Sequence, residues 1–341
     1  MIAAVLLAAA IPASASGALV VADARGFKAL FESAGSYSPS LSPEGIGRTL
    51  IDMVGVDLLS EQPKWGLARG ARILAFTPGA VGLSAPVKNL KSARRAMAIW
   101  RKGASNRAGA ISAHRVLLAS GRGAAALVKA MKRPKPLSKE LRSRARGPAW
   151  LWLRFAPPLR EALFALDASA AGLIARGLVL PANKAPLLAG SAPGPCDDAP
   201  AGCLRAGIGA AGHDLLGDAL REAGRSPPPD AARFSSRLDG FDLRQLTDQR
   251  SLPRAPLWSI SFDAPAAAGP ALAGQLDLAD IDKALATLTP LDALRGSAAA
   301  SAYAAHLLYG FLLRAAGPLT LTGSPAGNGA EIELRLPITS R

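Results

Sequence analysis

The sequence predicts an α+β protein of two related lobes, each a mainly antiparallel sheet covered by helices. Three observations support this fold class. Short apolar runs alternate with amphipathic helical patterns, tight-turn signals join consecutive strands, and several short motifs recur in the same order about 186 residues apart. The chain has 341 residues, half of them hydrophobic, so it is long enough to bury two cores.

The clearest stretch covers residues 72–100. Residues 72–77 read as a strand, the Pro-Gly pair at 78–79 as a tight turn, and residues 81–87 as a returning strand. A helix should follow to residue 100, because apolar side chains recur at the spacing of one helix face: Leu90, Ala93, Met97 and Trp100.

A second stretch, residues 256–288, repeats the order strand, turn, strand and helix. Residues 205–224 resemble residues 18–35, and residues 240–244 resemble residues 55–59. The charge is not repeated, because acidic residues stand where the first stretch is basic: Asp277, Asp280 and Asp282. These matches predict an internal duplication in which only the scaffold is shared.

The predicted organisation has four parts. Residues 1–16 form a signal peptide, and residues 17–190 form the first α+β repeat. Residues 191–204 form a linker rich in Pro and Gly, and residues 205–341 form the second repeat.

The first 16 residues predict export to the periplasm or cell envelope. Residues 2–11 are apolar and Ala13-Ser14-Ala15 fits a small-x-small cleavage site, although no Lys or Arg precedes the apolar run. Two alternatives remain open. Residues 2–22 are long enough for an uncleaved membrane anchor, or the segment is a strand of a cytosolic protein.

The linker holds the two cysteines of the chain, Cys196 and Cys203. In an oxidising compartment such a pair predicts a disulfide, with two free thiols as the alternative. Zinc would need about four ligands, and no histidine is close in sequence. The sequence therefore predicts no metal and no cofactor.

The net charge of +15 is concentrated in residues 62–139, which contain 17 Lys or Arg and no Asp or Glu. The rest of the chain has a net charge of −2. Such a field attracts polyanions. In an envelope these are lipid head groups, lipopolysaccharide or acidic glycans, and nucleic acid only if the protein is not exported. The candidate anion-binding residues are Lys88, Lys91, Arg94, Arg95 and Arg122. The alternative is a solvated basic face that only aids solubility.

Two glycine-rich motifs have features of phosphate-binding loops. Residues 207–212 fit G-x-G-x-x-G, but the acidic residue expected about 20 positions later falls in a Pro-rich linker. Residues 120–123 precede a helix but lack the Lys-Ser/Thr end of a phosphate-binding loop. A structural turn is the preferred interpretation of both.

No catalytic motif is visible, and we expect a protein that is not an enzyme. The three histidines, His114, His213 and His306, are not paired at helical spacing, and no G-x-S-x-G motif occurs. The alternative is a secreted or periplasmic hydrolase whose site is assembled in space. That reading requires a histidine, a carboxylate and a serine to meet in one pocket.

Three further segments are assigned from local patterns. Residues 103–109 read as a loop, residues 150–155 as a strand, and residues 159–166 as a helix that starts after two prolines.

Residues 55–59 (GVDLL) and 63–67 (PKWGL), followed by strand, turn, strand and helix, resemble exported bacterial proteins of unknown function built from repeated α/β halves. The resemblance covers residues 18–100. It implies export and duplication, and it implies no catalytic residue.

Overall fold

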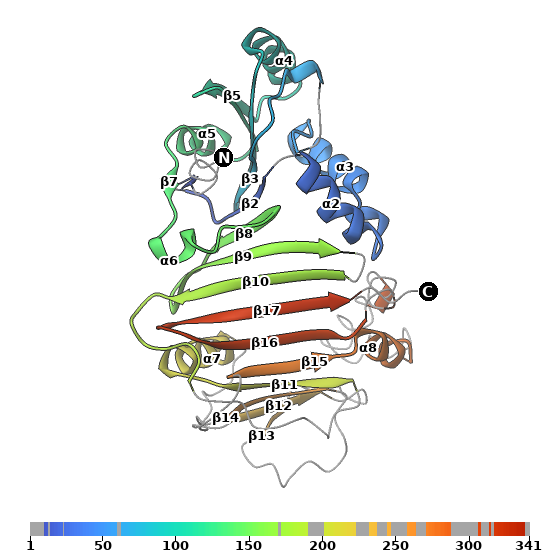
Figure 1. Cartoon of the computed structure of the whole chain (residues 1–341), viewed down its shortest axis with the longest axis vertical. Coiled ribbons are helices and arrows are strands. Elements are labelled where there is room, and N and C mark those ends of the chain that lie inside the picture. The colour runs from blue at the N-terminus through green and yellow to red at the C-terminus, as the bar shows by residue number, and fades with distance from the viewer. Residues whose placement is uncertain are drawn as a thin grey trace. The chain divides into compact units, whose positions relative to one another are not determined.

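A computed structural model shows an α+β protein with mainly antiparallel sheets, as the sequence predicts (Figure 1). It describes residues 10–12, 14–22, 24–59, 63–169, 172–189, 201–222, 232–236, 244–246, 258–263, 271–287, 306–307, 314 and 317–337. The chain forms two compact units. The first contains residues 1–155 and 161–169, and the second contains residues 156–160 and 170–341.

The main sheet in the described part of the first unit is antiparallel, with the strand order β9-β8-β2-β3-β4-β6-β5. Their bounds are Gly17–Val21 (β2), Arg72–Thr77 (β3), Ala80–Pro86 (β4), Arg107–Ser112 (β5), Arg115–Gly121 (β6), Ala149–Arg154 (β8) and Leu159–Ser169 (β9). A separate pair joins Ala10–Ile11 (β1) to Lys135–Pro136 (β7).

The α-helices assigned in the described part of this unit are Ala24–Gly35 (α2), Pro43–Val54 (α3), Leu90–Lys102 (α4), Ala124–Lys132 (α5) and Lys139–Arg142 (α6). Both ends of α3 carry residues that are typical of helix ends. The Ser42 hydroxyl accepts the Gly45 N–H at 3.1 Å, Pro43 is the first helical residue, and Gly55 ends the helix at a φ of +81°.

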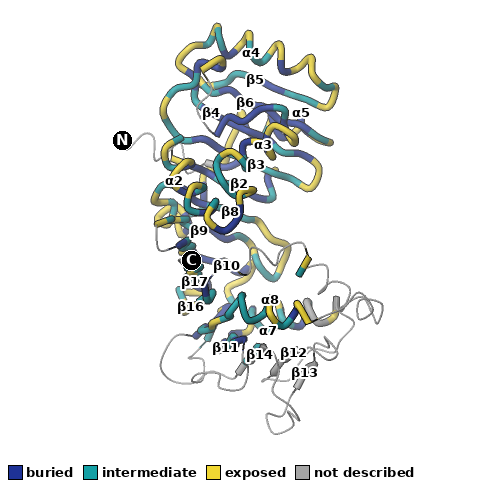
Figure 2. Tube along the Cα trace, turned by 90° about the vertical axis from the view of Figure 1, so that its right-hand side faces the viewer, coloured by how far each residue is buried: buried dark blue, intermediate teal, exposed yellow. Residues whose placement is uncertain are grey.

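Helices α4 and α5 cover opposite faces of the β4–β6–β5 region. A Cβ on Gly109 would meet Met97 of α4, whereas a Cβ on Gly82 would meet Leu127 and Met131 of α5. Gly109 pairs with Leu118 and Gly82 pairs with Ala119, so the two glycines face opposite sides of the sheet. Along α4 only Ala93 and Trp100 are buried, and most of the helix is exposed or intermediate in Figure 2.

The described strands of the second unit pair in the order β13-β12-β14-β11-β15-β16-β17-β10, all antiparallel except the β11–β14 pair. Their bounds are Gly172–Pro181 (β10), Gly202–Gly207 (β11), Ala232–Ser236 (β12), Arg244–Leu246 (β13), Trp258–Asp263 (β14), Leu272–Leu276 (β15), Leu319–Ala326 (β16) and Gly329–Pro337 (β17). The two α-helices assigned in this unit's described part are Ala210–Glu222 (α7) and Leu278–Leu285 (α8).

Two secondary-structure predictions were wrong. Residues 159–166 are not a helix but most of strand β9, which pairs with β8 from Ala149↔Leu166 to Arg154↔Glu161. Residues 103–109 are only partly a loop, because β5 begins at Arg107 and pairs with β6. In both cases a partner strand decides the conformation, and its contribution is not visible in the local sequence.

The boundary between units also differs from the prediction. The sequence placed it at residues 191–204, whereas the compact units divide near residue 170. The reason is β10, which pairs over its length with β17 and therefore belongs to the second unit.

The predicted duplication is matched in element order but not in strand pairing. In the first unit, β3 pairs directly with β4 and α4 follows. In the second unit, β11 lies between β14 and β15, and α8 follows. The fold therefore does not itself show a repeated lobe.

Candidate functional site

The candidate site is built around α4, whose start is fixed by a turn. Asn89 caps the helix by accepting the Ser92 N–H at 3.0 Å. The Gly66 carbonyl accepts the backbone N–H groups of Lys88 at 2.9 Å and Asn89 at 3.2 Å. Gly66 has a φ of +59°, and a Cβ there would lie 2.8 Å from that of Asn89. This turn holds Trp65, at the end of the 3-10 helix Pro63–Trp65, beside α4.

The other end of α4 is anchored by Trp100. Its indole N–H donates to the Val54 carbonyl at 2.8 Å, which joins α4 to the end of α3. The Arg107 guanidinium lies 5.2 Å from the centre of the Trp100 ring and donates to the Trp100 carbonyl at 2.8 Å. Gly55 makes room for this contact, because a Cβ there would lie 2.2 Å from the guanidinium.

Between these two anchors lies an open cavity of about 520 Å³, which we call the Trp65 cavity. Three cationic side chains line it: Lys64, Arg95 and Arg107. Its apolar wall includes Trp65, Trp100 and Ile99, whose side chain is unusually exposed at 66%. No carboxylate lines it among the described residues.

Two N–H donors beside this cavity lack an acceptor within the part of the chain that is described. They are the indole Nε1 of Trp65, a residue only 2% exposed, and the Nε of Arg107. Leaving a buried donor unpaired costs about 1–3 kcal/mol. Both donors belong to residues that line the positively charged cavity, but the two nitrogen atoms themselves are buried.

A second groove, of about 420 Å³, lies on the other side of α4. It is lined by Leu90, Arg94 and Met97 of the helix and by the β5–β6 turn, including His114. Ala113 and His114 both have positive φ, which non-glycine residues rarely adopt.

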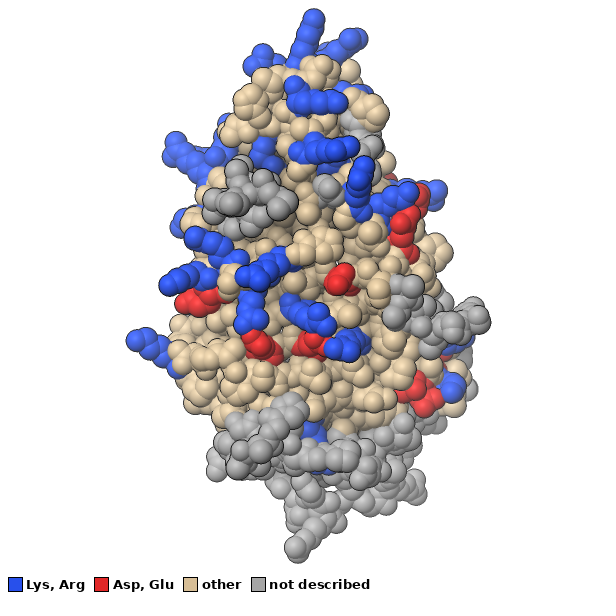
Figure 3. Space-filling model, viewed as in Figure 1, with Lys and Arg blue, Asp and Glu red and all other residues tan. Residues whose placement is uncertain are grey.

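The predicted anion-binding residues are all exposed, but the structure does not gather all five. Arg95 lines the Trp65 cavity, Arg94 lines the second groove, and Lys88 and Lys91 flank the start of α4. Arg122 lies in the β6–α5 turn beside Gly79, at the other end of β4 from Lys88, and lines neither hollow. Figure 3 shows Lys and Arg side chains spread over the first unit, with few Asp or Glu among them.

Some cations of the acid-free segment have structural roles. Arg72 is 4% exposed and donates to the carbonyls of Leu58 and Leu59. Arg115 donates to Ser84 and to the Ala71 carbonyl, and its burial lowers the pKa of the guanidinium to about 10. These two are therefore not available to a partner.

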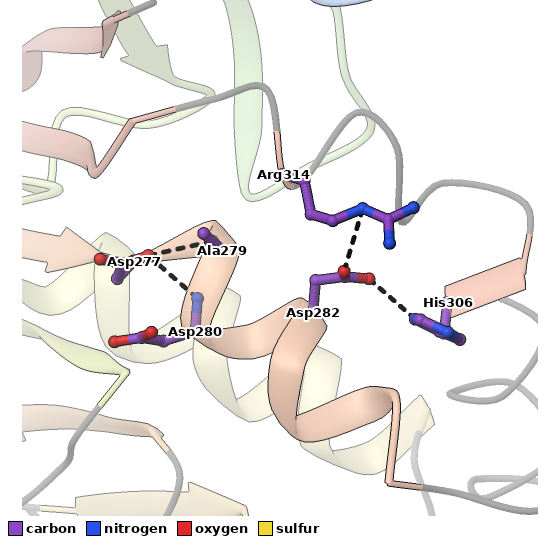
Figure 4. A network of polar contacts seen from close by, with 6 residues as sticks. All are labelled: Asp277, Ala279, Asp280, Asp282, His306 and Arg314. Atoms are coloured by element: carbon purple, nitrogen blue, oxygen red, sulfur yellow. Dashed lines mark hydrogen bonds and ion pairs between the residues drawn. The ribbon is translucent and has the colours of Figure 1, made fainter. Parts of the chain in front are cut away.

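A second polar cluster lies in the second unit (Figure 4). Asp282 of α8 is 2% exposed, and its Oδ1 lies 2.8 Å from the Nδ1 of His306. Its Oδ2 lies 3.5 Å from the Nε of Arg314. The structure thus pairs one histidine with a carboxylate. Among the described residues no serine contacts this pair, so the hydrolase alternative still lacks its nucleophile.

The G-x-G-x-x-G motif has a packing role. Gly207 ends β11 and α7 begins at Ala210. A Cβ on Gly209 would lie 2.3 Å from the Pro186 carbonyl, and one on Gly212 would lie 2.5 Å from that of Leu187. The Gly209 N–H donates to Leu187, and the Ala211 N–H donates to Pro186. Because these carbonyls occupy the helix N-terminus, the structural-turn interpretation fits the geometry.

The predictions for the N-terminal segment and for the cysteine-containing linker fall partly outside the described residues. Cys203 is buried in β11, but Cys196 lies outside the described residues, so the disulfide stays a prediction. Residues 1–9 also lie outside them, whereas residues 17–21 form a strand paired on both sides. Within the described ranges, no helix is long and apolar enough to cross a membrane, and no three metal-ligating side chains cluster.

No protein-family model matches the sequence, and no curated protein matches it either. Among solved structures, crystal form IV of TP0453 aligns with a TM-score of 0.29 and 9% identity, covering 51% of this chain and 79% of that chain. A TM-score this low does not indicate a shared fold, so the function must be argued from the chain's own residues.

Sequence reasoning missed three residues of the site: Lys64, Trp65 and Arg107. Lys64 and Arg107 belong to the acid-free segment, but its charge pattern alone does not distinguish them from the other cations of that segment. Trp65 lies beside α4 only after folding. The Asp282–His306 pair was missed for the same reason, since the two residues are 24 positions apart.

Proposed function

We propose that this chain is an exported, non-enzymatic protein of the cell envelope that binds an anionic partner through its first unit. The observation that carries the proposal is the exposed cations of α4, Lys91, Arg94 and Arg95, in a segment that contains no carboxylate. None of them forms an ion pair with the described residues. Partners of suitable chemistry are lipid head groups, lipopolysaccharide and acidic glycans.

The physical basis is electrostatic attraction to a surface. Each Lys or Arg near an anionic membrane contributes about 1 kcal/mol, and the attraction falls off within a Debye length, about 8 Å at physiological salt. Four such residues near the start of α4 would supply about 4 kcal/mol, or roughly a thousandfold in affinity.

The test is a sedimentation assay with vesicles of phosphatidylglycerol and phosphatidylcholine. The variant Lys88→Glu/Lys91→Glu/Arg94→Glu/Arg95→Glu should lose binding, and added salt should weaken the wild type. The matched control reverses four exposed cations of α5 and the segment after it, namely Lys129, Lys132, Arg133 and Lys135. Helix α5 covers the opposite sheet face, so this control should retain most of the binding. Equal losses in both variants would contradict the proposal.

Export and the disulfide are tested together by the intact mass of protein recovered from a bacterial periplasm. Export predicts a mass that starts near Ser16, which leaves β2 complete. The disulfide predicts that Cys196 and Cys203 alkylate only after reduction. An uncleaved chain with free thiols, found only in the cytosol, would overturn both and favour nucleic acid as the anionic partner.

A hydrolase is the second candidate, and the Asp282–His306 contact favours it. In such a site the carboxylate would orient the imidazole, and a serine would be the nucleophile. A fluorophosphonate probe tests this directly. Labelling that His306→Ala abolishes would support a hydrolase, and absence of labelling would reject it.

The internal duplication also stays a proposal. The common order of β3-β4-α4 and β14-β15-α8 supports it, while the different pairing requires that β11 entered between the two strands of the second copy. A set of related sequences in which the two halves align with each other would support it.

A further inference from the structure

We propose that the Trp65 cavity is a binding site for a single phosphate group. The inference deepens the proposed function and rests on it. The exposed cations of α4 attract an anionic surface or solute, and the cavity binds one phosphate of it. The cavity lies within the first unit.

The charge of the cavity suits a phosphate. Lys64, Arg95 and Arg107 line it, and no described lining residue is acidic. The nearest acidic residues in sequence are Glu61, which lies outside the described residues, and Asp57, which is 5% exposed and accepts the Leu59 N–H. Guanidinium groups bind phosphate through parallel hydrogen bonds, and an ammonium group contributes a point charge.

The fixed position of the Arg107 guanidinium suits an anion with several oxygens. The Trp65 Nε1 and the Arg107 Nε are buried and have no acceptor among the described residues. Arg107 is held in place by the Trp100 ring and carbonyl, so its guanidinium is oriented before a ligand arrives. A solubilising surface would not need an arginine that is oriented in advance.

The rim of the cavity suits an amphiphile. Ile99 is 66% exposed and lines the cavity beside the cations. A phosphate ester of a lipid would place its charged group among the cations and its apolar part along Ile99. Free phosphate would contact the cations alone. A lipid head group and free phosphate would therefore bind through the same phosphate chemistry, and only the contact with Ile99 would differ between them.

The test follows the five tryptophan indole N–H signals by NMR during titration of the full chain. The probes are inorganic phosphate, dihexanoyl phosphatidic acid and, as a monovalent carboxylate control, acetate. The Trp65 signal, assigned through its sequential connectivity, should move saturably with a phosphate-bearing probe and not with acetate. Saturation with both phosphate probes at equal affinity identifies free phosphate, and saturation with the lipid alone identifies a head group. A Trp65 signal that moves with neither overturns the proposal.

Two variants change only exposed residues, so neither should prevent the protein from folding. Lys64→Gln/Arg95→Gln should lower the affinity for the phosphate probe at least tenfold. Lys129→Gln/Lys132→Gln removes the same charge from α5 and should change its affinity less than twofold. An equal loss of affinity in the two variants would show that only the overall positive charge attracts phosphate, and it would overturn the inference.

Vesicle sedimentation of the wild type, run in parallel, separates this inference from the proposed function. Vesicle binding with an unmoved Trp65 signal would reject the cavity and leave the proposed function standing. A moved Trp65 signal without vesicle binding would support the phosphate site and reject a membrane surface as partner.

Discussion

Helices α4 and α8 occupy the same place in the element order of their units, yet they use charge in opposite ways. On α8, Asp277 caps the helix, Asp280 pairs with Lys283, and Asp282 contacts His306 and Arg314. On α4, Lys91, Arg94 and Arg95 point to solvent without an ion pair to a described residue. Charges that are satisfied internally stabilise the fold, whereas charges left exposed are available to a partner.

The largest expected difference in stability between these helices comes from Asp282. Its replacement by Ala would remove a buried carboxylate that contacts His306 and Arg314 and should lower the free energy of unfolding by about 2–3 kcal/mol, since Arg314 itself is largely exposed. Arg94→Ala on α4 should change it by less than about 0.5 kcal/mol. Urea denaturation measures both. Similar losses in the two variants would remove the distinction between structural and available charge.

The glycine motif before α7 gives the next effect. Gly209→Ala places a Cβ against the backbone carbonyl of Pro186, which should cost about 1–3 kcal/mol through overpacking. Thermal unfolding measures this, with addition of a nucleotide as a second readout. An unchanged melting temperature together with nucleotide binding that the variant loses would restore the phosphate-loop interpretation.

The caps of the two helices should behave alike although their charges differ. Asn89 caps α4 and Asp277 caps α8, each by accepting backbone N–H groups at 3.0 Å. Replacement of either by Ala should cost about 1 kcal/mol in urea denaturation. A negligible cost at only one of them would show that the two helices are not held in equivalent ways.

The smallest effect concerns the exposed ion pairs of β10 and β17. A hydrogen bond from Arg176, and a second from Arg335, lower the pKa of Glu333. Because the folded pKa lies below the unfolded one, this stabilisation is present above about pH 4.5 and is lost as the pH falls through the folded pKa. Glu333→Gln should reduce the acid dependence of stability by a few tenths of a kcal/mol, since the arginines are solvated. A larger change would indicate a coupled network.

The sequence predicted the parts of the fold that depend on local patterns. The β3–β4 hairpin follows from its Pro-Gly turn, and α4 follows from apolar residues at helical spacing. Strand β9 could not be recognised locally, because the spacing of its apolar residues also fits a helix and only pairing with β8 decides between the two. Strand β5 could not be recognised locally either, because its side chains are small and give only a weak preference for a strand.

The candidate site divides in the same way. The exposed cations could be predicted, because the absence of Asp and Glu over residues 62–139 is visible in the sequence. The cavity could not, because Trp65 and Arg107 are 42 positions apart and meet only through the packing of α4. Arg122 shows the limit of a charge count, since it belongs to the basic segment but not to the α4 surface.

The central claim, that α4 rather than α8 meets an anionic partner, is tested most directly by amide hydrogen exchange of the wild-type protein with and without phosphatidylglycerol vesicles. Our account predicts slower exchange over residues 88–102 and over the turn at residues 63–66, with no change over residues 278–285. Protection of α8, or vesicle binding without protection of α4, would contradict it.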